Sequence, residues 1–220
     1  MIASQLMAET ITPLRSSDTG ATALELMDEL RVSQLPIVDD EEFLGLISET
    51  DILTYNNLEE PVGKHPLSLT DAYILENQHI YDVIRLIDAM KLTLVPVLDE
   101  KKHYLGAISL VSLSHNLSKL MALDNPGGII ILELNDKDYL LTEIAQIVES
   151  NDAKVLGMYI TTVPDSTRME VTLKINKMDV GPILQTFTRY NYIIKASYTE
   201  DSYTESLQDR YNSLMNYLNI

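Results

Sequence analysis

The sequence predicts a mixed α/β (α+β) chain in which two copies of a βαββα repeat precede a single βαββαβ domain. Three observations predict this architecture. A segment of the first half recurs about 60 residues later, each copy alternates amphipathic helices with apolar strands, and the order of elements changes after residue 127. The expected organisation is a pair of repeats at 1–122 (about 1–60 and 61–122), a linker at 123–127, a further domain at 128–199 and a C-terminal helix at 200–220.

The internal repeat is the strongest signal. The segment ALELMDELRVSQLPIVDDEEFLGLIS (23–48) recurs as VIRLIDAMKLTLVPVLDEKKHYLGAIS (83–109). Pro36 matches Pro96 at an offset of 60, and the glycines and serines that come next match at 61, so the second copy carries one inserted residue in its turn. Matched spacing in both copies indicates one structural unit used twice.

Each copy is expected to contain the same elements. Apolar residues spaced i, i+4, i+7 predict a helix in both copies: Ala23, Met27 and Leu30, then Val83, Ile87 and Met90. Asp18 is a plausible N-cap for the first helix. Two short strands come next, 35–38 and 43–47 in the first copy, and 95–98 and 104–108 in the second. Because proline cannot donate to a β-ladder, Pro36 is expected at a strand start or edge.

A closing helix is expected to open at Ser48, and at Ser109 in the second copy. The first copy resembles the CBS domain, because it consists of a helix, the residues LPIVD, a polar turn and the residues LGLISETD. Two tandem copies resemble a CBS-domain pair. The resemblance covers about residues 1–122. It implies a pseudo-twofold arrangement with a cleft between the repeats.

The same resemblance implies a nucleotide site in that cleft. Gly45-Leu-Ile-Ser48-Glu-Thr50-Asp51 matches the family's motif in full, and the family's aspartate accepts hydrogen bonds from the ribose hydroxyls. Ser48 and Thr50 are expected at a helix N-terminus, where free N–H groups and the helix dipole favour a phosphate. The resemblance implies an adenosine nucleotide (AMP, ADP or ATP) as the ligand. The expected nucleotide-binding residues are Thr12, Pro13, Leu14, Pro36, Ser48, Thr50 and Asp51. Residues 12–14 occupy the position at which the family's backbone contacts the base. Arg15 could reach a phosphate.

A second interpretation of the motif needs no ligand. Ser48 and Asp51 have the spacing of a capping box, and both interpretations can hold together. The second copy has Val111 where Thr50 stands and Ser112 where Asp51 stands, so its site is expected to be empty or altered. We therefore expect at most one good nucleotide site per pair.

The last third predicts the order βαββαβ, which gives a ferredoxin-like fold. Its expected elements are a strand at 129–135, a helix at 139–150, strands at 154–163 and 168–175, a helix at 180–190 and a strand at 192–197. This order, placed after a CBS pair, resembles an ACT domain. The resemblance implies a ligand loop at Asn135, Asp136, Lys137 and Asp138, but this loop has no glycine, so a sheet used only for dimerisation is an equal alternative.

Composition limits the partners and the chemistry. The chain carries 33 acidic residues against 16 Lys and Arg, a net charge of −17, which disfavours nucleic acid and membrane as partners. It has no cysteine, no signal peptide and no run of about 20 apolar residues, so a cytoplasmic protein is expected. The four histidines lack metal-ligand spacing and no enzyme motif occurs, so no metal, no cofactor and no enzymatic activity are expected.

The whole arrangement resembles the acetoin-utilisation (AcuB-like) proteins. The resemblance implies a homodimer that senses an adenosine nucleotide and passes its state to an unidentified metabolic enzyme. The alternative is a structural or interaction dimer with vestigial ligand sites. The tail at 200–220, with apolar residues at near-helical spacing, is expected to pack on a neighbouring domain or subunit.

Overall fold

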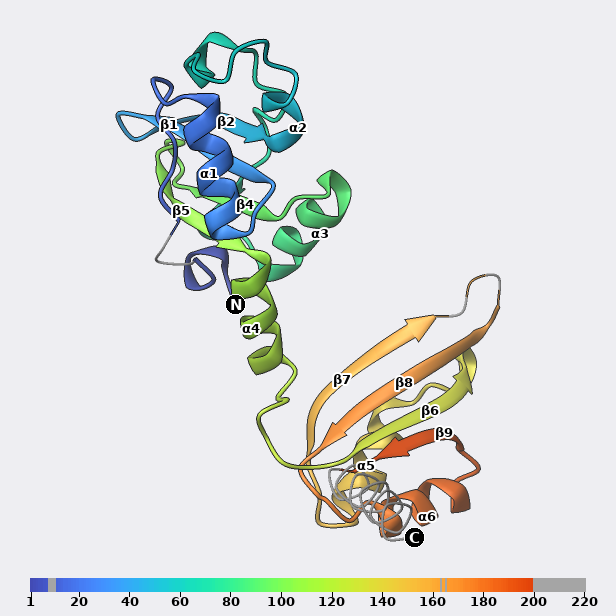
Figure 1. The fold of residues 1–220 in the computed structure, drawn as a ribbon. Coiled ribbons are helices and arrows are strands. Elements are labelled where there is room, and N and C mark those ends of the chain that lie inside the picture. The colour runs from blue at the N-terminus through green and yellow to red at the C-terminus, as the bar shows by residue number, and fades with distance from the viewer. Residues whose placement is uncertain (8–10, 163, 165, 200–220) are drawn as a thin grey trace, which may run out of the picture. The chain divides into compact units, whose positions relative to one another are not determined.

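The computed structural model describes residues 1–7, 11–162, 164 and 166–199. The chain divides into two compact units, Met1–Asn116 and Leu117–Ile220 (Figure 1). The boundary falls inside a helix, a few residues before the linker expected at 123–127.

The first unit contains both repeats. The first repeat consists of η1 (Ala3–Gln5), α1 (Gly20–Leu30), β1 (Gln34–Asp39), β2 (Glu42–Ser48) and the one-turn α2 (Glu49–Ile52). The second repeat consists of η2 (Val62–Lys64), β3 (Ile74–Leu75), α3 (Ile80–Met90), β4 (Leu94–Leu98), β5 (Tyr104–Ser109) and α4 (Leu110–Leu120). The predicted elements are confirmed, with one difference: α2 is a single turn, whereas α4 runs for 11 residues.

The two repeats have equivalent sheets. β1 pairs antiparallel with β2, and Leu14 forms one parallel bridge with Ile37. In the second repeat β4 pairs antiparallel with β5, and β3 pairs parallel with β4 through Ile74 and Val97, 60 residues beyond Leu14 and Ile37. The predicted βαββα order holds in both copies, although the leading strand of the first is reduced to a bridge.

The segment at the start of each repeat is hydrogen-bonded to the other repeat. The N–H of Ala3 donates to the carbonyl of Gln78 (2.9 Å), while the N–H of Val62 donates to the carbonyl of Asp18 (2.8 Å). These two bonds are equivalent under an offset of about 60, and the side chains of Ala3 and Val62 are both fully buried. The segment at the start of each repeat thus packs beside the beginning of the other repeat's helix. These contacts join the two copies into one unit.

The cap of α1 differs from the expected one. The Oγ1 of Thr19, and not Asp18, accepts the hydrogen bond from the N–H of Thr22 (3.2 Å). The carboxylate of Asp18 instead accepts the N–H of Arg15 (2.8 Å). The threonine lies three residues before the free N–H that needs a partner, which is the geometry of an N-cap.

Pro36 lies third in β1, and its position has a structural reason. The carbonyl of Pro36 accepts the N–H of Leu14 (2.8 Å), and the N–H of Val38 donates to the carbonyl of Leu14 (2.8 Å). The next bond of this parallel pattern would run from residue 36 to the carbonyl of Thr12. Proline has no N–H, so β1 makes no such bond and the carbonyl of Thr12 is left to other partners.

The second unit has the predicted ferredoxin-like order. It consists of β6 (Ile129–Asn135), η3 (Asp136–Asp138), α5 (Leu141–Glu149), β7 (Val155–Thr162), β8 (Arg168–Ile175), α6 (Gly181–Arg189) and β9 (Ile193–Tyr198). The four strands form one antiparallel sheet in the order β7-β8-β6-β9. The C-terminal helix expected at 200–220 lies outside the described residues.

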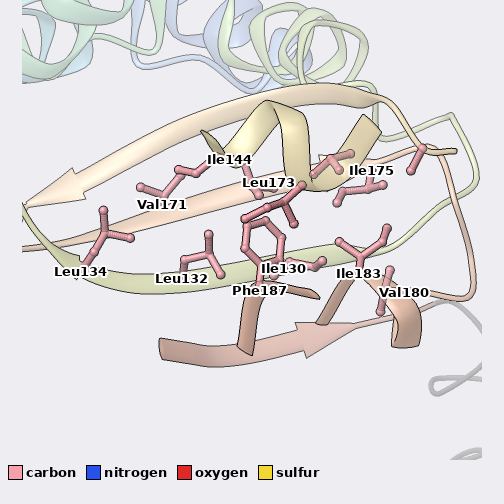
Figure 2. Packing of buried hydrophobic residues seen from close by; sticks show 13 residues of the cluster. Ile130, Leu132, Leu134, Ile144, Val171, Leu173, Ile175, Val180, Ile183 and Phe187 are labelled. Atoms are coloured by element: carbon pink, nitrogen blue, oxygen red, sulfur yellow. The ribbon is translucent and has the colours of Figure 1, made fainter. Parts of the chain in front are cut away.

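The core of the second unit lies between the sheet and its two helices. Alternate residues of β6 and β8 point toward α5 and α6, as Figure 2 shows, and Phe187 of α6 lies fully buried among them. The ring of Phe187 meets that of Tyr192 edge-on, with centroids 5.4 Å apart. In the described part of the chain, no helix is both long enough and apolar enough to cross a membrane.

Candidate functional site at the Asp51 end of the first repeat

Asp51 lies where β2 gives way to α2. The Oγ of Ser48 accepts the N–H of Asp51 (3.1 Å), and the carboxylate of Asp51 accepts the N–H of Ser48 (3.1 Å). The capping box expected from the sequence is therefore present. Thr50, on the same turn, is exposed to solvent.

The carboxylate of Asp51 receives further donors. The hydroxyl of Ser48 donates to Oδ2 (2.7 Å), and the hydroxyl of Ser68 donates to the same oxygen (2.9 Å). Burial acts to raise the pKa of Asp51, but the bonds from Ser48 and Ser68 outweigh it and leave this pKa below its ordinary value of 3.8. Asp51 is therefore an ionised acceptor at neutral pH.

The contact from Ser68 belongs to a segment between the repeats, here called the strap (residues 66–69). The carbonyl of Leu69 accepts the N–H of Leu46 (3.0 Å), so the strap runs along the free edge of β2. A Cβ placed on Gly45 would lie 2.9 Å from Cδ1 of Leu67. Glycine at position 45 therefore lets the strap lie close to the strand.

The remaining expected site residues lie across the same sheet. Leu14 is buried beside Pro36, which is buried in β1 and pairs with Leu46 of β2. Thr12 precedes Leu14 at the end of the sheet where Gln34 pairs with Ser48, and it is exposed. The sheet register thus brings Thr12 and Ser48 to the same end of the sheet.

Arg15 lies at the opposite end. It lines a cavity of about 470 Å³ with Val38, Asp39, Asp40 and Glu41, at the turn between β1 and β2. Hydrogen bonds from Ser16, and to a smaller extent the charge of Arg15, lower the pKa of Asp39. A phosphate held at Ser48 would be at the far end of these strands, so the structure does not bring Arg15 to it.

The second repeat has a different arrangement at the equivalent place. Ser112, in the position of Asp51, donates its hydroxyl to the carbonyl of Leu6 (2.5 Å). The Oγ of Ser109 accepts the N–H of Ser112 (3.1 Å) and serves as the N-terminal cap. The side chain of Ser112 is thus bound to the chain's own backbone.

A cavity of about 460 Å³ lies beside this second end. It is lined by Ile11, Leu30, Arg31, Val32, Thr93, Ser109, Leu110, Val111, Ser112 and His115. Ile11 therefore lies at the second repeat's end of the unit. The neighbour of Asp51 from outside its own turn is Ser68, which the sequence did not single out.

The loop expected to bind a ligand in the second unit borders a cavity of about 420 Å³. Asn135, Lys137 and Asp138 line it, whereas the N–H of Asp136 is bonded to the carbonyl of Thr167 (2.9 Å). Residues that flank the loop complete the lining (Glu133, Leu134, Leu140 and Glu143), together with Tyr190, Asn191, Tyr192 and Ile193 from a distant part of the chain. These distant residues could not be assigned from the spacing of the loop.

The histidines have separate surroundings. His65 stacks on Tyr55 with ring centroids 3.5 Å apart, and His103 pairs with Asp99 through Nδ1 (3.0 Å). His79 caps α3. Within the described ranges, no group of three histidine and acidic side chains is placed to hold a metal ion.

Comparison with known proteins agrees with this fold. The family model of the CBS domain matches residues 3–57. The first repeat is a CBS domain. The second repeat copies its elements and its strand register, so the first unit has the architecture of a CBS pair, followed by a ferredoxin-like domain.

The chain is also similar to a curated protein and to solved structures. It is 29% identical over 105 residues to inosine-5'-monophosphate dehydrogenase of Halobacterium salinarum, which is 46% of this chain and 21% of that protein. The chain thus spans about a fifth of that relative's length.

Three solved structures are similar in fold. A CBS domain pair/ACT domain protein of Thermotoga maritima is 22% identical, with a TM-score of 0.49, over 54% of this chain and 98% of that one. CBSX2 in complex with AMP is 21% identical, with a TM-score of 0.46, over 54% and 96%. The AcuB-type acetoin utilization protein of Vibrio cholerae is 22% identical, with a TM-score of 0.48, over 57% and 98%.

Proposed function

We propose that this protein is a cytoplasmic regulatory sensor whose first CBS repeat binds an adenosine nucleotide (AMP, ADP or ATP) through Asp51. The observation that carries the proposal is the ionised carboxylate of Asp51, held at a strand end with its pKa lowered by hydroxyl and N–H donors. Such a carboxylate accepts hydrogen bonds from two vicinal ribose hydroxyls. Proteins with CBS domains are commonly regulatory and sense nucleotides, which supports the same role.

The surrounding residues are assigned in the proposal by their chemistry. The backbone of Thr12, Pro13 and Leu14 would face the base, because Pro36 leaves the carbonyl of Thr12 without a partner from β1. Ser48 and Thr50 would hold a phosphate through hydroxyls and the free N–H groups of the turn. α2 has only four residues, so its dipole adds little to this anion contact.

Stability measurements test the proposal. A ligand that binds only the folded form must raise the unfolding midpoint. We expect AMP, ADP or ATP at 100 times its Kd to stabilise the wild type by about 2.7 kcal/mol and to leave Asp51→Ala unchanged. Guanosine and cytidine nucleotides serve as controls. Equal midpoints with and without every adenosine nucleotide would remove the sensor function.

The proposal includes a homodimer that passes the ligand state to a partner enzyme. The edge strand β7 supports it, because Val155–Thr162 carries no charged residue while the other three strands of its sheet do. Its Tyr159 and Ile160 are 51% and 41% exposed. Long apolar edge strands pair with another chain unless they are protected. A second copy of this chain is the partner that suits β7 best. Two chains that each carry a net charge of −17 repel each other least where the contact surface is uncharged.

Sedimentation velocity tests this part. Ile160→Lys places a charge on the edge and is expected to weaken the dimer, whereas Lys154→Ala, just outside the strand, is the control. A wild type that sediments as a monomer at micromolar concentration contradicts the dimer.

The second unit is proposed to be an ACT-like domain. The cavity at Asn135, Lys137 and Asp138 offers both an ammonium and carboxylates, the pair of charges that a free amino acid would need. Titration of the 20 amino acids by calorimetry tests it, with Lys137→Ala as the variant expected to lose binding. No heat with any amino acid would leave the sheet as a dimerisation module only.

A second candidate function is a structural or interaction dimer with vestigial ligand sites. The bond from Ser112 to the carbonyl of Leu6 favours it, because the chain's own backbone has taken the place of a ligand there. The two candidates differ at Asp51. A vestigial protein would show the same stability with and without nucleotide in both wild type and Asp51→Ala.

A further inference from the structure

We propose that the hydroxyl of Ser68 is an internal competitor that occupies the ribose-binding carboxylate of Asp51 and must leave before a nucleoside binds. This inference rests on the proposed function and concerns the regulation of the same site. It is carried by three hydrogen bonds that meet at one atom, Oδ2 of Asp51.

The first step concerns the capacity of Asp51. The N–H of Ser48 (3.1 Å), the hydroxyl of Ser48 (2.7 Å) and the hydroxyl of Ser68 (2.9 Å) all donate to Oδ2. A carboxylate offers about two acceptor sites on each oxygen. Oδ2 already receives three donors, and a hydroxyl of a ribose diol that binds both carboxylate oxygens would be a fourth. At least one of the three donors must therefore yield.

The second step identifies which donor yields. Both other donors belong to Ser48, whose N–H and hydroxyl oxygen form the capping box that holds the first turn of α2. Ser68 is an exposed residue of the strap, 17 positions away in sequence, and it reaches Oδ2 with a hydroxyl, the same group that a ribose presents. Loss of the contact from Ser68 leaves the cap intact, so Ser68 is the donor that a ligand can replace.

The third step concerns how the strap is held. Its main-chain link to β2 is the bond between Leu46 and Leu69 (3.0 Å), and its side-chain contact is Leu67 against Gly45. The strap can release Ser68 by a rotation of one hydroxyl-bearing side chain without losing these contacts. Release of Ser68 therefore requires no movement of the strap's main chain.

The second repeat provides the contrast. There the contact runs in the opposite sense, because Ser112 donates to the backbone carbonyl of Leu6. Ser112 stands in the position of the carboxylate and offers no charged acceptor to a ribose. Displacement of a competing hydroxyl can therefore expose a carboxylate in the first repeat but not in the second.

The experiment measures adenosine affinity and the pKa of Asp51 in the same full-length variants. Ser68→Ala removes the competitor, Ser68→Thr keeps a hydroxyl, and Ser112→Ala removes the corresponding contact in the other repeat. Calorimetry gives the Kd of adenosine, and a carbon-13 NMR titration without ligand gives the pKa of the Asp51 carboxyl.

The expected result has two parts. Ser68→Ala binds adenosine more tightly by about three- to tenfold, the effect of one ordinary hydrogen bond, because the contact is exposed to solvent. The pKa of Asp51 rises because a donor is lost. Ser68→Thr and Ser112→Ala resemble the wild type. Equal or weaker binding by Ser68→Ala overturns the inference, because Ser68 would then be neutral or a positioning residue. If neither protein binds adenosine although the pKa rises, the proposed function itself fails.

Discussion

The side chain of Gln34 accepts two hydrogen bonds from Thr93, one from its N–H (2.9 Å) and one from its hydroxyl (2.7 Å). Thr93 also accepts the N–H of Ser33 (2.9 Å). Gln34 is the first residue of β1, Thr93 directly precedes the equivalent strand β4, and Gln34 pairs with Ser48 across the sheet. The link between the repeats therefore reaches the strand end that carries the candidate site.

This link predicts coupling between Gln34 and Thr93. Thr93→Val leaves the amide oxygen of Gln34 without its donor hydroxyl and is expected to lower the free energy of unfolding by about 1–2 kcal/mol. Gln34→Leu, which puts in place the residue found at position 94 of the second repeat, is expected to cost a similar amount. In a double-mutant cycle from urea unfolding, the pair should show a coupling energy of about 0.5–2 kcal/mol. Strict additivity would mean that the link contributes nothing.

The cap of α2 gives a second prediction. Ser48→Ala removes the acceptor for the N–H of Asp51 and is expected to reduce the free energy of unfolding by about 1 kcal/mol. Ser109→Ala, the matched change at the start of α4, removes the acceptor for Ser112 and should cost about the same. Only Ser48→Ala should also raise the pKa of Asp51. A shift of that pKa in Ser109→Ala would be inconsistent with the separation of the two sites.

The lowered pKa of Asp51 predicts a pH dependence. Because this carboxylate is more acidic in the folded chain than in the unfolded one, its contribution to stability is present above the ordinary pKa of 3.8. The contribution is lost as the pH falls through the folded-state value. The difference in unfolding free energy between wild type and Asp51→Asn should therefore be constant from pH 5 to 7, within about 0.3 kcal/mol, and shrink below about pH 4. A difference that grows with acid would contradict the assignment.

The core of the second unit predicts local unfolding. Phe187 is fully buried against both helices and the sheet, so Phe187→Ala is expected to cost about 3–5 kcal/mol. The two compact units have separate cores, so urea should unfold the second unit of this variant first. Amide hydrogen exchange would show early loss of protection in 129–198 and none in 20–52. Simultaneous exchange in both ranges would show that the units unfold together.

Much of the fold can be predicted from short-range patterns in the sequence. The apolar spacing at Ala23 and Met27 predicts α1, and the same spacing recurs in α3. The ferredoxin-like order of the second unit was likewise predicted, with boundaries within two residues for most elements. Periodicity and the internal repeat carry this information because both depend on residues close together in the chain.

The parts that the sequence did not predict depend on the arrangement in space. The contact from Ser68 to Asp51 joins residues 17 apart through a strap that has no periodic pattern. The bonds of Ala3 to Gln78 and of Val62 to Asp18 likewise join residues that are far apart in the chain. The one-turn length of α2 also could not be predicted, because Ser48 and Ser109 begin their helices with the same cap and the difference lies in the residues after that cap.

The direct test of the central claim is calorimetric titration of AMP and adenosine into wild type, Asp51→Asn and Ser112→Ala. Asparagine keeps the size of the side chain while it removes the charge that accepts both ribose hydroxyls. The account predicts one site per chain in wild type and Ser112→Ala, and at least a tenfold loss of affinity in Asp51→Asn, about 1.4 kcal/mol. Unchanged affinity in Asp51→Asn, or no binding in the wild type, would contradict it.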